Sequence, residues 1–402
     1  MKKPAAAAFL ALFFIAIALP AVAQTATHLP EVTPEEAGLC PEVLATIDGE
    51  VEAALQDNRM PGAVIAIGRK GKLAFLRAYG NKQVQPETIP MDVDVVFDLA
   101  SITKPVAGAM SIMVLVEQGN IDIDERVAHY IPEFAANNKE DVTVRHLLLH
   151  TSGVPAANHL SQYEDGVEAA IANLFRSPVT GPPGTVYRYS CVGFLILGEL
   201  VRKVSGQDVD QFSREHIFAP LGMTETMYIL PDALRRRAAP TERRGGEWIQ
   251  GDVHDPRAYG LDGIAGNAGL FSTARDLAVF CDMMLRFGCS ARQDAEGADV
   301  RILEEATVRE MIAAVRVPEA EPTATRGLGW DILGGNRGDN ALPEAFGHLG
   351  FTGTGLWIYP RDDLFVIFLS NRVHPDGTGN VNTIRTRVRT IAVDSIIRYT
   401  VE

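Results

Sequence analysis

The chain has 402 residues, of which 47% are hydrophobic and 22% are charged, a balance typical of a folded globular protein of one or two domains. This composition excludes an intrinsically disordered chain and a collagen-like chain. The formal net charge of −14 argues against nucleic acid as a partner, because binding to phosphates requires clustered basic side chains.

The first expected element is a signal peptide. Residues 5–19 form an apolar run that is shorter than the roughly twenty residues needed to span a bilayer. Lysines precede this run, and Ala21-Val22-Ala23 follows it as an A-x-A cleavage site. We therefore expect a signal peptide over 1–23, a mature domain over 24–402, no stable membrane span, and a periplasmic or secreted location. The alternative is an uncleaved membrane anchor.

The mature chain is expected to begin with a helix and a β-hairpin. Residues 42–56 repeat apolar side chains with helical spacing, and Pro41 stands just ahead of them. Two apolar runs, 62–68 and 73–76, flank the turn 69–72 and are predicted to be paired strands.

The middle of the chain is expected to be largely helical. The apolar spacing from 101 to about 222 is mostly helical and is interrupted by loops rich in Gly and Pro. Strand-like runs return at 355–359 and 364–369, and 384–399 closes the chain as an amphipathic helix. This order predicts one sheet built from both ends of the chain, with a helical region at about 105–250 inserted between them.

The cysteines and histidines give no metal signature. The chain contains four cysteines, Cys40, Cys191, Cys281 and Cys289. Cys281 and Cys289 are the one pair we consider for a disulfide, and whether they bridge is left open. His146 and His150 stand four residues apart without an acidic third ligand, so we expect structural roles for them and neither a metal nor an organic cofactor.

Ser101-Ile102-Thr103-Lys104 is the first candidate catalytic motif, at the start of a helix expected to run to Gly119. Residues three apart lie on the same face of a helix, so the lysine ammonium could reach the serine hydroxyl. The first turn also supplies free N–H groups and the positive end of the helix dipole. Both effects favour a developing alkoxide, although the S-x-x-K pattern alone is a weak signal.

Tyr189-Ser190-Cys191, just ahead of a helical run at 193–204, is the second candidate motif. A phenol has a pKa near 10, so base catalysis at neutral pH would require a shift of about three units. A nearby cation such as Lys104 supplies roughly one to three units. The alternative for an isolated tyrosine is a half-buried side chain with a satisfied hydroxyl.

His348-Leu349-Gly350-Phe351 is the third candidate motif and precedes the glycine-rich segment 352–355. A strand with glycines at a sheet edge can present a backbone N–H to a substrate carbonyl. A histidine there can donate to a carboxylate or assist proton transfer, although a lone histidine is usually structural.

In this order and spacing, the three motifs resemble those of the active-site serine superfamily. This superfamily includes class C β-lactamases, serine D,D-peptidases (penicillin-binding proteins) and β-lactamase-like carboxylesterases. LLLHTSG at 147–153, GNAGLFSTARDL at 266–277 and FGHLGFTGTGLWIYP at 346–360 extend the likeness. The resemblance implies an α+β fold, an α/β sandwich of an antiparallel sheet flanked by helices with an inserted all-helical region. The active site is expected at the junction.

The resemblance also implies a role for each motif position. Ser101 matches the nucleophile, Lys104 its activating partner and Tyr189 the proton shuttle. His348 and Gly350 match a strand motif of the K-T-G type. The implied reaction is acylation of the serine, departure of an alcohol or amine, and hydrolysis of the acyl-enzyme.

The oxyanion hole implied by the resemblance consists of the N–H groups of Ser101 and Phe351.

Two positions of the chain depart from the residues typical of the family. Cys191 stands where many relatives carry an asparagine that holds an acylamido group, and a thiol is a poor substitute in hydrogen bonding. His348 replaces the lysine of typical β-lactamases, which weakens attraction for a carboxylate. Arg372 could supply that cation, or it could form a surface ion pair.

These departures favour an exported β-lactamase-like carboxylesterase that acts on small esters. The alternatives are a D-alanyl-D-alanine carboxypeptidase or penicillin-binding protein that acts on peptides, then a class C-type β-lactamase. A penicillin-binding sensor without turnover is an alternative of a different kind. If protonation of His348 matters, it is expected to add an acidic limb to the pH profile near its own pKa. The sequence indicates neither the natural substrate nor the oligomeric state.

Overall fold

The computed structural model describes residues 28–294, 297–318, 324–334 and 342–398. The expected signal peptide, residues 1–23, lies outside the described residues. Among the described residues, the single helical stretch long and apolar enough to cross a membrane is Ala100–Glu117, and 83% of it is buried inside the protein. It is therefore a core helix of the fold.

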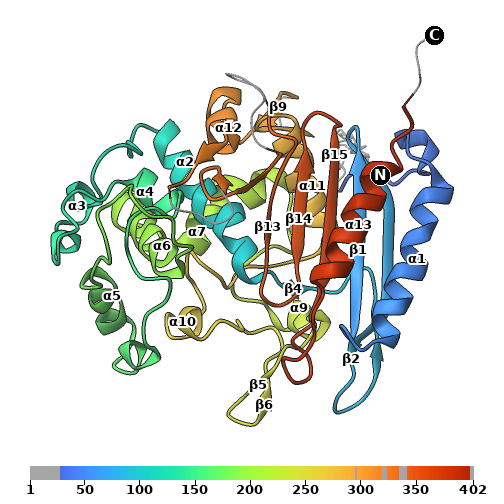
Figure 1. The fold of residues 1–402 in the computed structure, drawn as a ribbon, viewed down its shortest axis with the longest axis horizontal. Helices are drawn as coiled ribbons and strands as arrows, with labels where there is room; N and C mark the ends of the chain where they lie inside the picture. The colour runs from blue at the N-terminus through green and yellow to red at the C-terminus, as the bar shows by residue number, and fades with distance from the viewer. Residues whose placement is uncertain (1–27, 295–296, 319–323, 335–341, 399–402) are drawn as a thin grey trace, which may run out of the picture.

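A nine-stranded antiparallel sheet, in the order β10-β11-β12-β13-β14-β15-β1-β2-β3, is built from both ends of the chain (Figure 1). Its strands are β1 (Gly62–Arg69), β2 (Lys72–Gln83), β3 (Ile89–Pro90), β10 (Val315–Arg316), β11 (Thr325–Arg326), β12 (Asp331–Leu333), β13 (Ala345–Leu349), β14 (Gly355–Tyr359) and β15 (Leu364–Ser370). β1 pairs with β15 from Ala63 opposite Ser370 to Arg69 opposite Leu364. The expectation of one sheet from the two ends of the chain is confirmed.

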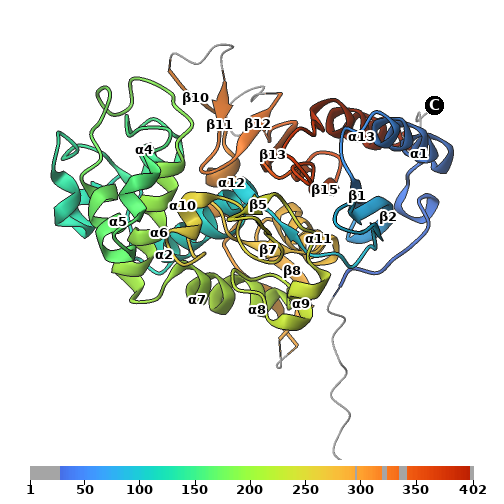
Figure 2. The same cartoon turned by 90° about the horizontal axis from the view of Figure 1, so that it is seen from below.

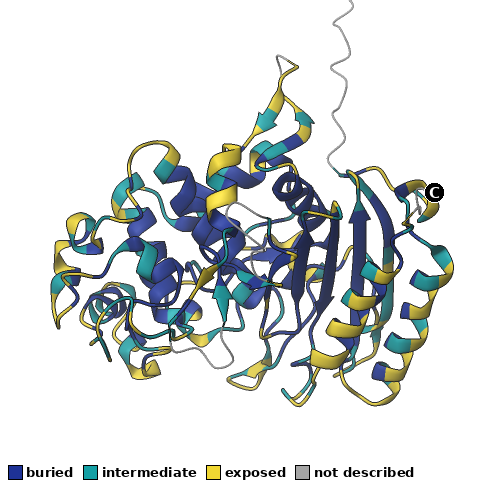
Figure 3. Cartoon of the chain, turned by 45° about the horizontal axis from the view of Figure 1, so that its top comes forward, coloured by how far each residue is buried: buried dark blue, intermediate teal, exposed yellow. Residues whose placement is uncertain are grey.

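Helices cover both faces of the sheet (Figure 2). α1 (Pro41–Gln56) and α13 (Asn382–Asp394) pack side by side on one face, and α11 (Ala274–Leu285) packs on the other. The central strands are buried on both faces, whereas the outer sides of α1 and α13 are exposed (Figure 3). Burial on both faces explains why β1 and β15 are continuous apolar runs rather than alternating ones.

The remaining α-helices lie mostly in the region inserted beside the sheet (Figure 1). They are α2 (Met110–Glu117), α3 (Val127–Tyr130), α4 (Val144–Leu148), α5 (Val167–Phe175), α6 (Cys191–Ser205), α7 (Val209–Ser213), α8 (Ala219–Leu221), α9 (Asp232–Arg237), α10 (Pro256–Tyr259) and α12 (Glu305–Ile312). Short strands pair outside the large sheet: β4 (Phe97–Asp98) with β7 (Phe271–Ser272), β5 (Arg243–Arg244) with β6 (Glu247–Trp248), and β8 (Cys289–Gln293) with β9 (Asp299–Arg301). The expected α/β sandwich with a helical region is confirmed, while the exact limits 105–250 stay a prediction.

The helix expected from Ser101 to Gly119 is irregular at its start. A 3₁₀ turn at Ala100–Ile102 leads into a π-helical segment at Lys104–Ala109, and regular α2 follows. At Gly108 a Cβ would lie 2.8 Å from the carbonyl oxygen of Gly266, so the helix touches a neighbouring backbone there. Short π segments are frequent at functional sites.

Other elements of the structure also differ from those expected from the sequence, and each difference has a local cause. β2 extends beyond the apolar run at 73–76, since its second half pairs with β1 and β3. The sequence pattern did not show this extension because that half is partly exposed and carries polar residues. α13 ends before 399 because Ile396 leaves the helix and pairs with Leu39. Cys281 and Cys289 are both free thiols, so the disulfide that we considered is absent.

Candidate active site

A cavity of about 560 Å³ lies at the junction of the sheet and the helical region. Its lining residues come from all three sequence motifs and from three further segments: Ser101, Tyr187, Tyr189, Arg326, Asp331, His348, Leu349, Gly350, Phe351, Arg372, Gly379, Asn380, Asn382 and Arg385. A volume of this order suits a small-molecule substrate.

Ser101 and Lys104 are in direct contact. The Lys104 Nζ donates to Ser101 Oγ at 3.1 Å and to the backbone oxygen of Asn267 at 3.0 Å, and the lysine is fully buried. Burial by itself lowers the pKa of Lys104, but Tyr189, Cys191 and then Asp255 oppose it, and the pKa stands above its usual range. Lys104 is therefore a buried ammonium beside the serine hydroxyl.

Tyr189 lies next to the same ammonium. The Lys104 Nζ lies 5.0 Å from the centre of the Tyr189 ring, and Tyr189 is a cause of the raised pKa of Lys104. Ser190 fixes this position at the start of α6, because its Oγ accepts the N–H of Gly193 at 2.9 Å and donates to the oxygen of Pro155 at 2.6 Å. The structure thus brings the first two motifs together.

Two buried histidines face Tyr189, with ring centres at 4.6 Å for His150 and 5.9 Å for His348. The Nδ1 of His348 lies 2.9 Å from the carbonyl oxygen of Leu349, so Nδ1 carries the proton and Nε2 is an acceptor. His150 has the opposite arrangement, because its Nδ1 accepts the N–H of Ser190 at 3.1 Å and its Nε2 carries the proton. The structural role expected for His150 stays a prediction, and the LLLHTSG stretch is the sequence signal for its position beside Tyr189.

Burial holds the pKa of both histidines well below its usual range, and the charges of Arg326 and Lys104 lower it further. Both imidazoles are therefore neutral at pH 7. The acidic limb expected from His348 moves to a pH well below 6.5 for the same reason.

This neutrality predicts acid sensitivity of the fold. Below about pH 6.5 the unfolded chain binds protons at these two positions while the folded chain does not, so the free energy of unfolding falls as the pH decreases. Each histidine contributes up to about 1.4 kcal/mol per pH unit in this window. The free energy of unfolding is measured with urea at several pH values between 7.5 and 5.5. Its decrease per pH unit should be smaller for His150→Asn than for the wild-type protein. The matched control is His129→Gln in the exposed part of α3, and equal slopes in all three proteins would contradict the assignment.

The loop after β13 is hydrogen-bonded to the segment that precedes Ser101. The hydroxyl of Thr352 donates to the oxygen of Asp98 at 2.8 Å, and that of Thr354 donates to the oxygen of Leu99 at 3.0 Å. A Cβ at position 350 would lie 1.9 Å from Thr354 Oγ1 and 2.5 Å from the oxygen of Leu99. Gly350 is therefore required by the close approach of the two segments.

Phe351 stands at the mouth of the cavity. Its side chain is 60% exposed and lies between the His254 ring, at 5.6 Å, and the Arg372 guanidinium, at 4.7 Å from the ring centre. No acceptor for the Phe351 N–H is found in the described ranges. Leu349, 40% exposed, adds a second apolar side chain to the lining.

Two arginines make one side of the cavity cationic. Arg372 donates to the oxygen of Gly379 at 2.7 Å, and Arg385 donates to the oxygen of Thr354 at 2.8 Å. Neither forms an ion pair with a carboxylate within the part of the chain that the structure describes. Burial, with the charge of Arg372, lowers the pKa of Arg385 to about 10. Arg385 was missed because an arginine in an amphipathic helix is expected to face solvent, yet it is 6% exposed.

Cys191 is the first residue of α6, and its thiol is free. Cys191 is one of the groups that raise the pKa of Lys104, but it does not line the described cavity. No group of three or more His, Cys, Asp or Glu side chains that could hold a metal occurs among the described residues.

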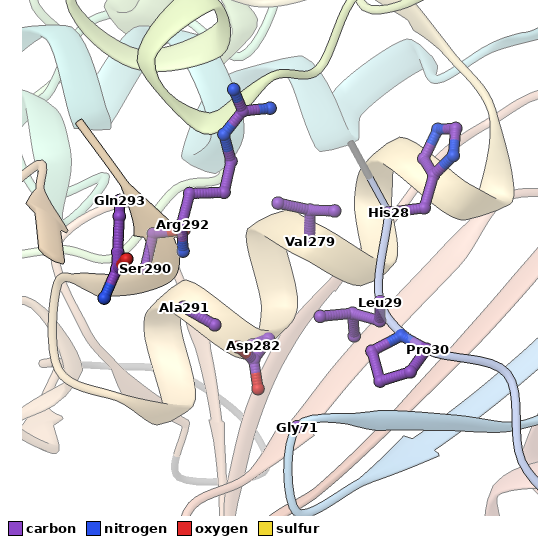
Figure 4. Close-up of a pocket in the computed structure, with 10 residues that line it drawn as sticks. All are labelled: His28, Leu29, Pro30, Gly71, Val279, Asp282, Ser290, Ala291, Arg292 and Gln293. Carbon is purple, nitrogen blue, oxygen red and sulfur yellow. The ribbon is translucent and has the colours of Figure 1, made fainter. Parts of the chain in front are cut away.

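A second cavity, of about 250 Å³, lies over α11 beside the segment that starts at His28 (Figure 4). Asp282 in this cavity pairs with Arg286, with 2.8 Å between Oδ2 and Nε. Ser290 lines it, but neither a lysine nor a tyrosine does so in the described ranges. The arrangement of nucleophile, ammonium and phenol therefore belongs to the larger cavity.

Comparisons with known proteins agree with this architecture. The sequence profile of a family described as Beta-lactamase matches residues 47–389. A protein of Escherichia coli (strain K12) named as a D-alanyl-D-alanine carboxypeptidase is 29% identical, over 86% of this chain and 86% of that protein. An N-acetylmuramyl-L-alanine amidase of Bacillus subtilis (strain 168) is also 29% identical, over 93% of this chain and 92% of that protein. A solved class C β-lactamase superposes with a TM-score of 0.71 at 18% identity, covering 89% of this chain and 98% of the other.

Proposed function

Because the chain belongs to the β-lactamase family of serine hydrolases, we propose that it forms an acyl-enzyme on Ser101 and cleaves an amide bond whose leaving group carries a free carboxylate. This is the chemistry of a carboxypeptidase or a small-substrate amidase. Membership of this family makes the protein a hydrolase related to peptidases, esterases and β-lactamases.

In the proposed mechanism, Tyr189 reacts as a phenolate held by the Lys104 ammonium: Ser101 Oγ attacks the substrate carbonyl, and its proton passes to the Tyr189 oxygen of this pair. The N–H groups of Ser101 and Phe351 hold the negative oxygen of the tetrahedral intermediate. The pair then returns the proton to the leaving amine, and the bond between carbon and nitrogen breaks. Water enters, gives up a proton to the same pair, and releases the acyl group from Ser101.

The observation that carries the choice of substrate is the pair Arg372 and Arg385. Two guanidinium groups without a carboxylate partner in the described residues line the cavity on the side of Phe351. An arginine binds a carboxylate through charge-assisted hydrogen bonds. This supplies the cation that His348 does not, and it places amide substrates ahead of the neutral esters favoured by the sequence. The relatives named as a carboxypeptidase and an amidase support the same order.

A carboxylesterase is the second candidate. Cys191 stands where an asparagine would hold an acylamido group, and Leu349 presents an exposed hydrocarbon to the cavity. Both features suit a small apolar ester, which needs no carboxylate.

A substrate panel separates the two candidates. We expect kcat/KM for a D-Ala-D-Ala peptide with a free terminal carboxylate to exceed that for the same peptide amidated at its C-terminus by about tenfold or more, since a charge-assisted hydrogen bond contributes roughly 1.5–3 kcal/mol. Arg385→Gln should remove most of this preference. Arg309→Gln, which alters an exposed arginine paired with Glu305 on α12, is the matched control.

Short p-nitrophenyl esters and a chromogenic cephalosporin are assayed in parallel. Ester turnover without any preference for a free carboxylate would replace the proposal with the carboxylesterase. Efficient cephalosporin hydrolysis would replace it with a β-lactamase.

We also propose that the protein is exported. The support is the pattern of the first residues, in which lysines, an apolar run and Ala21-Val22-Ala23 follow one another. Such a location would give the enzyme access to cell-wall peptides.

A further inference from the structure

Asp98 is a buried carboxylate that the proposed mechanism does not use. It is the last residue of β4, it is 3% exposed, and it stands three residues before Ser101. Both of its side-chain oxygens accept backbone N–H groups: Oδ1 accepts that of Ala100 at 2.7 Å, and Oδ2 accepts that of His254 at 2.7 Å. The carboxylate therefore joins two backbone segments that are far apart in the sequence.

The first of these bonds holds an unusual turn next to the nucleophile. Ala100 has a φ of 47°, in the left-handed region that a residue with a side chain rarely adopts. Such a conformation persists only where the surroundings impose it. Because Ala100 is bonded directly to Ser101 through a planar peptide group, its backbone angles set the direction of the Ser101 N–H. The bond from Ala100 to Asp98 thus aims one donor of the proposed oxyanion hole.

The second bond leads to the other donor of the hole. The ring of His254 stacks on that of Phe351, with 5.6 Å between the ring centres and 22° between the ring planes. The residue that follows, Thr352, donates its hydroxyl to the backbone oxygen of Asp98 at 2.8 Å. Asp98 is therefore bonded to the residue before Ser101 and to the residue after Phe351.

His254 has a fixed orientation between Asp98 and Glu242. Asp98 accepts its backbone N–H, and its Nε2 lies 2.5 Å from Glu242 Oε2. The imidazole is 13% exposed, so it has little freedom to turn. A shift of the backbone at position 254 therefore moves the ring on which Phe351 stacks.

We propose that Asp98 is a positioning residue that sets the spacing between the N–H groups of Ser101 and Phe351, the two donors of the oxyanion hole. This inference rests on the proposed function and deepens it, because it assigns the geometry of the hole to a side chain that does not line the cavity. Two donors stabilise an oxyanion only when both point at the position that its oxygen occupies. Loss of the Asp98 bonds should therefore slow acylation and leave the binding of the reagent nearly unchanged.

Asp98→Asn tests this role without changing the size of the side chain. The amide oxygen of asparagine accepts one N–H, but its nitrogen is a donor and faces the other backbone N–H. Labelling at increasing concentrations of a fluorophosphonate gives the maximal rate constant, kinact, and the concentration for half-maximal rate, KI. We expect kinact to fall about 10- to 100-fold while KI changes less than about threefold, since a small displacement of a catalytic group costs up to roughly 10²-fold in rate.

Asp276→Asn is the matched control, because Asp276 is also fully buried and does not line the cavity. Its Oδ2 accepts the N–H of Glu225 at 2.9 Å and the hydroxyl of Thr226 at 2.8 Å. Both substitutions should lower the thermal stability, because each removes an acceptor from a buried donor. Only Asp98→Asn should change kinact, which is a property of the folded protein and separates positioning from stability.

Glycine at position 100 provides a rescue. It adopts a positive φ as readily as a negative one, so the turn then needs less support from Asp98. Asp98→Asn combined with Ala100→Gly should have a kinact at least about threefold higher than Asp98→Asn alone. A double variant that is no faster would contradict the role of Asp98 in holding this turn.

A pair of esters reports on the oxyanion hole itself: p-nitrophenyl butyrate and its thiono analogue, in which sulfur replaces the carbonyl oxygen. Sulfur is a weak hydrogen-bond acceptor, so an intact hole favours the oxygen ester. The ratio of kcat/KM for the ester to that for the thionoester should fall at least about fivefold in Asp98→Asn and keep its wild-type value in Asp276→Asn. A loss of structure lowers both values and leaves their ratio unchanged.

Thr352→Val cuts the link between the hydroxyl of residue 352 and the carbonyl of Asp98, with Asp98 left in place. It should lower the same ratio, and this test does not depend on the folding of Asp98→Asn. A wild-type ratio in both variants, in protein that hydrolyses the butyrate, would overturn the positioning role of Asp98 alone. Wild-type protein that does not react with a fluorophosphonate would overturn the proposed function itself.

Discussion

Replacing Ser101 by alanine is expected to abolish covalent labelling by a fluorophosphonate and to lower turnover by a factor of about 10⁴ or more, since loss of a serine nucleophile costs up to roughly 10⁶ in rate. The reason is that its Oγ is the atom to which the buried Lys104 ammonium donates, at 3.1 Å, within the larger cavity. Mass spectrometry of the labelled protein and single-turnover kinetics measure the two effects. No other hydroxyl in the described lining of this cavity except those of two tyrosines could take over the attack.

The control for this experiment is Ser290→Ala, which changes a buried serine in the second cavity over α11 (Figure 4). It should be labelled at the wild-type rate. Labelling that persists in Ser101→Ala would move the nucleophile elsewhere. A stable adduct on Ser101 without turnover of any substrate would identify the protein as a penicillin-binding sensor instead of an enzyme.

The parts of the fold that the sequence predicted are those with long periodic patterns. α1, β1, β14 and β15 extend over five or more residues and bury an entire face, so their apolar spacing is visible. β10, β11 and β12 have two or three residues each, which is too short for a period to be recognised. These short strands at one end of the sheet are held by pairing with their neighbours and not by a pattern of their own.

Among the residues of the cavity, too, those related by a local sequence pattern could be predicted, and isolated residues could not. Ser101 and Lys104 could be related from the sequence because three residues make about one helical turn, and their contact survives the irregular helix. Arg326 and Arg385 could not be identified, because an isolated arginine is expected at the surface and only the tertiary structure shows that it is buried. The low pKa of His348 likewise depends on burial and on Arg326, which no local pattern reveals.

Lys104 and Tyr189 are expected to act as one unit. Their contact in the structure implies that each single change, Lys104→Met or Tyr189→Phe, removes the same path for the serine proton. General acid–base catalysis of this kind typically contributes about 10²–10⁴ in rate, so we expect losses of this size in the second-order rate constant for fluorophosphonate labelling. Thermal unfolding checks that the buried change at Lys104 leaves the protein folded. Tyr259→Phe, at an exposed ring that stacks on Arg244, is the matched control for Tyr189→Phe.

The double variant distinguishes a shared path from two separate contributions. If the pair transfers one proton together, Lys104→Met with Tyr189→Phe should be about as slow as the slower single variant, because the second change removes a step that is already lost. If the two effects multiply instead, the residues assist the reaction independently. Lys104 would then act on the serine hydroxyl directly through its bond to Oγ, and Tyr189 would serve only to protonate the leaving group.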